Sequence, residues 1–187
     1  PQLAVTSPIA DQSIINAVSS PATQVTITNI QCNSDAYGSF AYPTATNELQ
    51  MEKGIVLSSG SVLDAPGFGA NFVSSIMNED GDADLDILSN QQGGQESYDA
   101  CVVEMDVFVA TNELTFEYVF GSEEYPEFVF SPGGYNDIFA FLVSGPGIAG
   151  DPGLGTQKNI AVLPGGTTPV EINSVNNQVN WEYYRNN

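Results

Sequence analysis

Residues 78–86 carry carboxylates at alternate positions around a glycine, which is the composition of a loop that binds a cation through oxygen. The carboxylates are Asp80, Asp82, Asp84 and Asp86. Gly81 lets the backbone turn tightly, so that alternate side chains can converge on one centre. Calcium takes about 6–8 oxygen ligands and accepts carboxylates, amides and carbonyls together. The order differs from that of an EF-hand. We therefore predict a calcium site of another kind, with a solvated acidic loop as the alternative.

A second oxygen-rich cluster is predicted where two apolar runs approach each other. Residues 121–128, which contain Glu123 and Glu124, directly follow an aromatic run, and Pro126 favours a fixed turn there. Asn136 and Asp137 stand at the entrance to the next apolar run. Acids at the end of one strand and at the start of the next can meet at one edge of a β-sandwich. The predicted calcium ligands are Glu123 or Glu124, Asn136 and Asp137, with Asp99 and Asp106 as further candidates.

Three aromatic residues flank this second cluster and could contact a sugar or another ligand. They are Tyr125, Phe128 and Tyr135. Each ring offers a flat apolar face, and each tyrosine adds a hydroxyl group at its end. Packing inside the core is the alternative interpretation, because aromatic residues on strands most often fill the interior.

The residue types favour no enzymatic reaction. The chain has no histidine, which removes Ser–His–Asp and Cys–His catalysis and most catalytic zinc sites. Paired carboxylates can hydrolyse glycosides. The side chains of the neighbours Glu123 and Glu124 would diverge on an extended strand, although a distant pair such as Glu124 and Asp137 remains possible. Nothing in the sequence indicates the raised pKa that a general acid needs, so we expect a protein that is not an enzyme.

Charge is the strongest signal in the composition, with 23 acidic residues against 3 basic ones and a formal net charge of −20. Phosphate contacts require Lys and Arg, so nucleic acid is excluded as a direct partner and docking on anionic lipid is disfavoured. A compact body with this charge repels itself, and each divalent cation would neutralise two carboxylates. The alternative is an acid-rich surface that serves solubility or a salty habitat. No apolar run approaches about 18 residues, so membrane insertion is not expected.

The two cysteines, Cys32 and Cys101, are too far apart in the chain to form a C-x-x-C redox or zinc pair. In an oxidising compartment they could form one disulfide. Two buried free thiols are the alternative, because the sequence does not show whether the side chains meet.

Hydrophobic spacing predicts one short helix followed by strands. Ile14, Ile15 and Val18 have helical spacing within residues 11–20, and Pro21 fits the end of that helix. From Thr23 onward the apolar residues alternate with threonines, which is typical of a strand.

Short apolar runs bounded by Gly, Pro, Asn or Ser continue through the rest of the chain. They cover residues 54–57, 101–109, 114–120, 138–143, 160–163 and 170–175. A hairpin is expected at residues 111–113, between two alternating runs. Many short strands with few helices indicate an all-β fold, which we predict to be a jelly-roll-like β-sandwich with one short N-terminal helix. We expect one domain over residues 1–187, with residues 64–97 as a long functional loop.

The central run is distinctive enough to carry a resemblance. Residues 118–128 read YVFGSEEYPEF and residues 135–147 read YNDIFAFLVSGPG. Together they resemble the choice-of-anchor L domain of secreted bacterial proteins. Further segments agree with this family over nearly the whole chain, namely residues 54–61, 81–85, 98–100, 103–107, 159–165 and 170–176.

This resemblance implies a location more than a chemistry. Such domains occur in secreted or surface proteins of bacteria, often with a separate C-terminal anchoring signal, and adhesion is their usual suspected role. The family supplies no set of catalytic or metal-binding residues. Its members usually continue past residues 183–187 into at least one further strand pair, so the resemblance implies missing C-terminal strands and an edge that another chain could fill. The start of the sequence lacks a basic leader, so any export signal is expected to lie outside it.

These observations combine into one functional hypothesis with two alternatives. We expect a calcium-stabilised module for extracellular adhesion or binding on a bacterial cell surface. Its partner would be a protein or glycan on another surface, or further copies of itself. The first alternative is a structural or assembly subunit of an extracellular filament. The second is a lectin-like module that binds glycans with calcium or with the aromatic residues beside the acidic edge.

Overall fold

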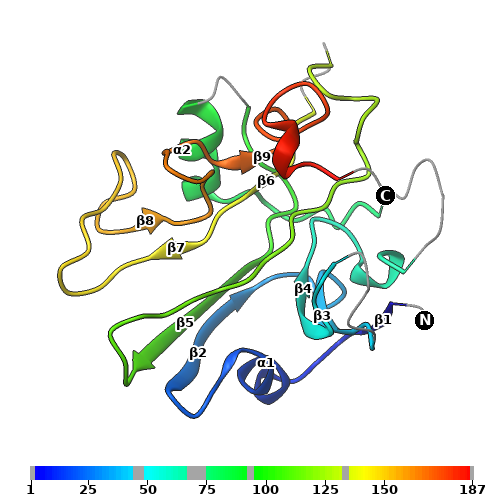
Figure 1. The fold of residues 1–187 in the computed structure, drawn as a ribbon. Helices are drawn as coiled ribbons and strands as arrows, with labels where there is room; N and C mark the ends of the chain where they lie inside the picture. The colour runs from blue at the N-terminus through cyan, green and yellow to red at the C-terminus, as the bar shows by residue number, and fades with distance from the viewer. Residues whose placement is uncertain (1–2, 44–48, 67–74, 92–94, 132–134, 186–187) are drawn as a thin grey trace. The chain divides into compact units, whose positions relative to one another are not determined.

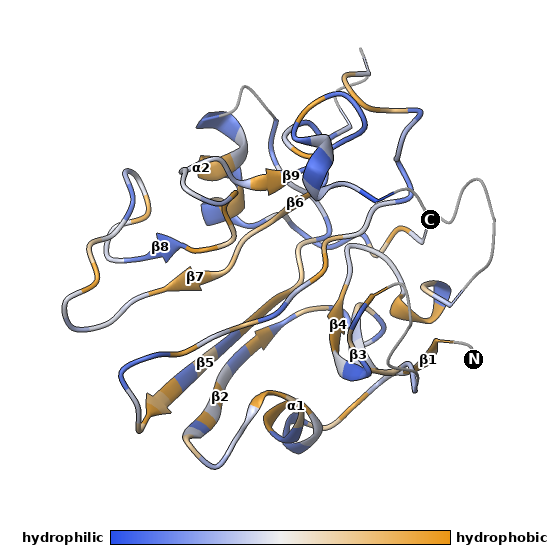
Figure 2. Cartoon of the chain, viewed as in Figure 1, coloured by the Kyte–Doolittle hydropathy of each residue, from blue (hydrophilic) through white to orange (hydrophobic). Residues whose placement is uncertain are grey.

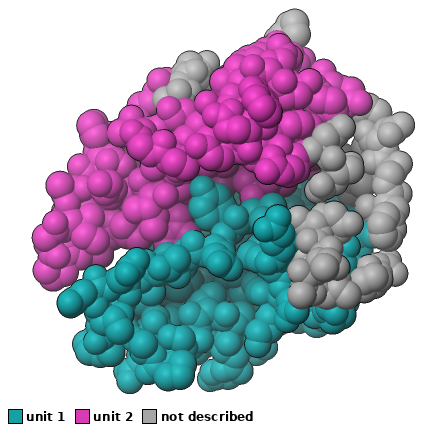
Figure 3. All heavy atoms as spheres, viewed as in Figure 1, with its two compact units in different colours: residues 1–80, 98–119 teal, residues 81–97, 120–187 magenta. Residues whose placement is uncertain are grey.

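A computed structural model describes residues 3–43, 49–66, 75–91, 95–131 and 135–185. The chain divides into two compact units, which Figure 3 distinguishes by colour. Unit 1 comprises Pro1–Asp80 and Tyr98–Val119, and unit 2 comprises Gly81–Ser97 and Phe120–Asn187. The expected single domain stays a prediction, and each unit is described by itself.

Unit 1 contains a small antiparallel sheet with the strand order β1-β3-β4. Its strands are β1 (Ala4–Thr6), β3 (Tyr37–Ala41) and β4 (Lys53–Leu57). β4 confirms the strand predicted from residues 54–57, whereas β1 and β3 were not predicted. Phe40 on β3 is buried, and a short 3₁₀ helix, η1 (Val62–Asp64), contributes the fully buried Val62.

A long two-stranded ladder is the second part of unit 1. β2 (Thr23–Gln31) pairs antiparallel with β5 (Val102–Val109), as Figure 1 shows. Both strands confirm predictions made from alternating hydrophobicity, and this alternation is visible in Figure 2. The predicted N-terminal helix is also present as α1 (Asp11–Val18), which buries Ile14.

A disulfide joins Cys32 and Cys101 in unit 1. Cys32 directly follows β2 and Cys101 directly precedes β5, so the bond closes the end of the ladder. Their Cα atoms are 4.4 Å apart. Of the two alternatives that the sequence left open, the structure therefore contains the bonded one.

Unit 2 has much shorter strands and one α-helix. β6 (Ile138–Phe139) pairs with β9 (Val170–Glu171), and β7 (Leu142–Val143) pairs with β8 (Lys158–Asn159). The α-helix is α2 (Ala83–Gln91), and a 3₁₀ helix, η2 (Trp181–Tyr183), follows near the end of the described chain. No described helix of either unit is long and apolar enough to cross a membrane.

Buried polar side chains supply much of the internal bonding of unit 2. Asn159 is 2 % exposed, and its Oδ1 accepts hydrogen bonds from the N–H groups of Phe141 (3.1 Å) and Ala161 (3.0 Å). Asn176 is fully buried and bonds to three backbone groups of its own loop. These contacts fix the backbone where the strands are too short to do so, because each one satisfies a polar group that is removed from water.

Several sequence predictions need correction in detail. The strand and hairpin expected at residues 111–120 are wrong, because the structure assigns no strand to residues 113–120. The single strand expected at 138–143 is divided into β6 and β7, which have different partners. The long loop expected at 64–97 contains α2. The fold is mostly strands in small antiparallel sheets, which agrees with an all-β class, while a sandwich or jelly roll is not shown.

Candidate functional site

The first acidic stretch starts a helix instead of forming an open loop. Oδ1 of Asp82 accepts hydrogen bonds from the backbone N–H groups of Asp84 (2.9 Å) and Leu85 (3.1 Å). This arrangement is an N-cap, in which a side-chain oxygen satisfies N–H groups that lack a partner in the first helical turn. Asp84 and Asp86 then fall in the first turn of α2. Helical spacing turns alternate side chains away from each other, so the convergence expected from a period of two does not occur.

Ser97, which follows α2 in the sequence, forms hydrogen bonds with the first turn of this helix. Its backbone N–H and its Oγ both donate to Oδ1 of Asp86, each at 2.6 Å. The side-chain hydrogen bond lowers the pKa of Asp86 below its usual range, and the backbone hydrogen bond adds to the effect. Gly81 is required here because a Cβ at this position would lie 2.0 Å from the carbonyl oxygen of Ser97.

Asp80 and Asp99 belong to unit 1, where Asp99 organises a turn. Its Oδ1 accepts from the N–H of Glu79 (2.7 Å), and its Oδ2 accepts from the N–H of Met77 (3.3 Å). The backbone carbonyl of Asp80 accepts from the N–H of Ala100 at 3.1 Å. The side chains of Asp82, Asp86 and Asp99 therefore already serve as hydrogen-bond acceptors in local structure.

The second acidic cluster is built around the hydroxyl group of Ser122, within unit 2. Oγ of Ser122 donates to Oδ2 of Asp137 (2.7 Å) and accepts from the backbone N–H of Glu124 (3.1 Å). This pair of bonds brings the turn after residue 121 to the start of β6, as the sequence predicted for Glu124 and Asp137. Glu123 lies in the same turn but its side chain is exposed.

Glu124 is the electrostatically unusual member of this cluster. Its Oε2 is buried and has no hydrogen-bond partner among the described residues. Burial, followed by the negative charges of Asp137 and Glu123, raises the pKa of Glu124 to about 7. A carboxylate near two others with an unsatisfied oxygen is an unfavourable arrangement unless a proton or a cation compensates it.

Asn136 has a structural role beside this cluster. Its Nδ2 donates to Oε2 of Glu171 (2.9 Å), and its Oδ1 accepts from the N–H of Asn173 (3.1 Å). Glu171 is only 2 % exposed, and its burial raises its pKa, while the bond from Asn136 acts in the opposite direction. Both polar ends of the Asn136 amide are thus engaged with neighbouring segments.

Ser122 and Glu171 were missed by the sequence analysis, although each left a signal. Ser122 directly precedes the paired acids, so a hydroxyl group was available at the turn. Glu171 is a single acid between Val170 and Ile172 in a predicted strand, a position that indicates a buried carboxylate in need of a partner.

The three predicted ligand-binding aromatics divide into packing residues and one exposed ring. The hydroxyl group of Tyr125 donates to the carbonyl oxygen of Val175, and its ring lies 5.0 Å from that of Tyr184. Phe128 contacts Tyr135 edge to face, with ring centroids 5.3 Å apart. Tyr135 is 51 % exposed, whereas Tyr125 and Phe128 are half-buried.

The ten predicted metal ligands are divided between the units: Asp80, Asp99 and Asp106 belong to unit 1, and the other seven belong to unit 2. No group of three or more acidic or cysteine side chains that could hold a metal ion is found in the part of the chain that the structure describes. Ser122 hydrogen-bonds both the backbone N–H of Glu124 and the carboxylate of Asp137, so this cluster contains two carboxylates and a hydroxyl group, which are oxygen ligands of the kind that calcium accepts. Backbone carbonyls or water would have to complete the coordination, and calcium binding stays a prediction.

The family model of the Choice-of-anchor L domain matches residues 4–187, which is nearly the whole chain. No curated protein and no solved structure matches it.

Proposed function

The chain belongs to the Choice-of-anchor L domain family, and from this premise we propose that it is a calcium-stabilised, non-catalytic binding module that acts in adhesion. Membership of the family indicates a bacterial protein associated with the cell surface. The adhesive role and the calcium dependence go beyond what family membership supplies. They are supported by the acidic composition and by the environment of one carboxylate.

The buried, unpartnered Oε2 of Glu124 is the observation that carries the calcium proposal. Asp137 lies close enough to raise the pKa of Glu124 by repulsion, so the two carboxylates oppose each other once both are ionised. A divalent cation between them would remove this repulsion and give the unsatisfied oxygen a partner. Calcium bound there would stabilise the turn at Ser122 against the start of β6 and so fix the surface that meets the partner.

Thermal unfolding at pH 8, with calcium chloride or with EDTA, tests the proposal. A ligand that binds only the folded state adds about 2.7 kcal/mol to the free energy of unfolding at a hundredfold excess over its Kd. We expect the midpoint to rise with calcium in the wild type and to rise much less in Glu124→Gln. Glu182→Gln is the matched control, because it removes one exposed carboxylate from the same unit.

Two outcomes would overturn the calcium proposal. One is a midpoint that calcium leaves unchanged in the wild type. The other is an equal calcium effect in Glu124→Gln and Glu182→Gln, which would mean that calcium acts by general screening of the acidic surface.

The raised pKa of Glu124 also meets one requirement of a glycosidase acid, so the non-catalytic part of the proposal needs its own test. We expect no release of nitrophenol from a panel of aryl glycosides at pH 5–8. Hydrolysis that the Glu124→Gln and Asp137→Asn variants both abolish would overturn this part and leave the calcium test unaffected.

A glycan is the partner that one observation favours, because Tyr135 exposes its ring beside Asn136 and Asp137. Exposed aromatic rings stack on the apolar faces of sugars. Glycan-array binding that disappears in Tyr135→Ala and in EDTA would support a lectin-like module. Tyr183→Ala is the control, because Tyr183 is also half exposed in unit 2. Binding that both variants retain would remove Tyr135 from the site.

A further inference from the structure

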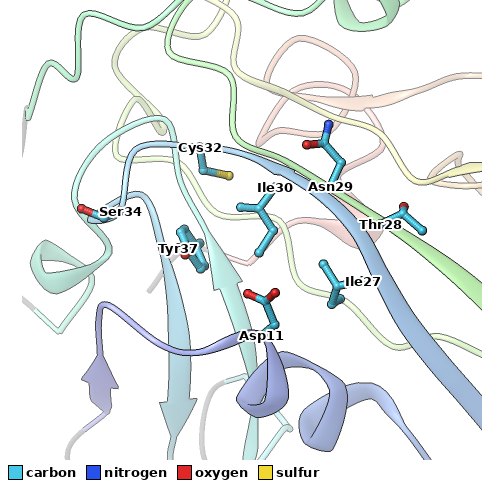
Figure 4. A pocket seen from close by; sticks show the side chains of 8 residues that line it. All are labelled: Asp11, Ile27, Thr28, Asn29, Ile30, Cys32, Ser34 and Tyr37. Carbon is cyan, nitrogen blue, oxygen red and sulfur yellow. The ribbon is translucent and has the colours of Figure 1, made fainter.

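A hollow in unit 1 combines a carboxylate with an apolar wall. It has a volume of about 430 Å³ and lies where α1, β2 and β3 meet. Figure 4 shows the carboxylate of Asp11 pointing from the start of α1 into the space between Ile27, Ile30 and Tyr37. Thr28 and Ser34 are also among the residues at the rim of the hollow.

A β-bulge builds the apolar wall. Residues three apart on a regular strand point to opposite faces, so Ile27 and Ile30 would not normally line one space. The register of β2 against β5 shifts between Ile27 and Asn29, which leaves Thr28 as an extra residue. Both isoleucines are therefore half-buried on the same side, and bulges of this kind commonly redirect side chains at binding sites.

The carboxylate of Asp11 lies in the first turn of α1, whose N-terminus favours a negative charge, but no positively charged side chain of the described residues lies beside it. Within the described residues it forms no hydrogen bond or ion pair, and no lysine or arginine lines the hollow. Lys53 is the single basic residue in the sequence of unit 1, and it lies on β4. A positive group brought by another molecule would meet an attractive field from the −20 net charge of the chain and a free carboxylate at close range.

We propose that this hollow binds the lysine side chain of a partner protein. The ammonium group would pair with the Asp11 carboxylate and lie near the ring of Tyr37, which attracts cations through its face. The aliphatic stem would contact Ile27 and Ile30, since lysine buries its methylene groups while its charge stays at the surface. An inorganic cation would leave the apolar wall unused. The hollow is independent of the calcium cluster, which belongs to unit 2.

NMR titration of the isoleucine methyl groups tests this assignment on the full chain, with and without calcium. The probes are N-acetyl-lysine methylamide, its uncharged counterpart N-acetyl-norleucine methylamide, and cadaverine as a free diamine. We expect the lysine compound to shift the Ile27 and Ile30 methyl signals with a millimolar Kd, and the norleucine compound to bind at least fivefold more weakly. Binding should also weaken when sodium chloride is raised to 0.5 M.

Two variants make the test specific. Asp11→Asn should weaken binding of the lysine compound at least fivefold, whereas Asp106→Asn should change it less than twofold. Asp106 is an exposed carboxylate on β5 of the same unit and does not line the hollow. Equal effects of the two variants, or equal binding of the lysine and norleucine compounds, would overturn the proposal. Cadaverine binding more than tenfold tighter than the lysine compound would overturn the choice of a protein partner.

Discussion

The two units of this protein achieve order in different ways. In unit 1, the strands β2 and β5 form a long ladder that the Cys32–Cys101 disulfide closes at one end. In unit 2, the ladders that the structure describes are at most two residues long, and buried asparagine and serine side chains bond to the backbone instead. Long ladders and a cross-link resist unfolding through backbone pairing and chain entropy, whereas unit 2 depends on individual polar contacts that single substitutions can remove.

Removal of the disulfide should lower the free energy of unfolding more than the other substitutions do. The loss should affect unit 1. Cys32 and Cys101 are separated by 69 positions, and closing a loop of this length is worth about 4 kcal/mol in the chain-entropy model. The Cys32→Ser/Cys101→Ser variant should lose about that much free energy of unfolding in urea. Hydrogen exchange should rise first in peptides from β2 and β5. An equal rise across peptides of unit 2 would break the distinction between the units.

The Asn176→Ala substitution should produce the matching effect in unit 2. Nδ2 of Asn176 donates to the carbonyl of Ile172 at 2.9 Å, and its Oδ1 accepts from the N–H groups of Gln178 and Val179, both at 2.8 Å. Without this buried side chain those groups lose their partners, at a cost of about 3 kcal/mol. Urea unfolding measures the loss. Asn177→Ala is the control, because Asn177 is exposed and should change stability by less than about 0.5 kcal/mol.

The same contrast explains what the sequence could predict of the fold. Alternation along residues 23–31 and 102–109 and helical spacing at 11–18 identified β2, β5 and α1, because periodicity records which face is buried. The apolar run at 138–143 does not form one continuous strand, because Phe139 and Leu142 belong to strands with different partners. Side-chain bonds such as those of Asn159 and Asn176 leave no periodic pattern, so the architecture of unit 2 was not predictable from spacing.

Within unit 2, Glu124 should make stability fall as pH rises. Its pKa is raised from 4.5 to about 7, so the folded protein holds this proton more tightly than the unfolded chain. The resulting stabilisation is complete below pH 4.5 and is lost as pH rises through about 7. Because the group is partly exposed, we expect a change of about 1–2 kcal/mol, measured by urea unfolding in EDTA. The pKa of Asp86 is lowered, so its effect on stability has the opposite dependence on pH. The stabilisation from Asp86 is present at higher pH and is lost only in acid.

Glu124→Gln should reduce this pH dependence, and Glu182→Gln should leave it unchanged. Burial also raises the pKa of Glu171, so part of the slope should persist in the Glu124 variant. If the stability of Glu124→Gln falls with pH as steeply as that of the wild type, the titrating group lies elsewhere. That result would weaken the electrostatic account of the Ser122 cluster.

The candidate site was predictable in its composition and less so in its geometry. The approach of Asp137 to the turn that contains Glu124 was expected from acids at the ends of adjacent apolar runs. The helix that begins within residues 80–86 was not predicted, because Asp82 can be both an oxygen ligand and a preferred N-cap residue, and α2 has a weakly amphipathic sequence. A capping residue before Ala83 was available as a helix signal, and the acidic composition concealed it.

Substitution of Asp82 should produce the smallest effect and resolves this ambiguity directly. Loss of an N-cap costs about 1 kcal/mol, so Asp82→Ala should lower the free energy of unfolding by that amount and increase hydrogen exchange in the first turn of α2. Asp82→Asn keeps a capping oxygen and removes the charge, so its stability should remain close to that of the wild type in EDTA. If Asp82 acted mainly as a calcium ligand, Asp82→Asn would instead abolish the stabilisation by calcium. Retention of that stabilisation in Asp82→Asn, together with its loss in Glu124→Gln, would assign the two acidic stretches to different tasks.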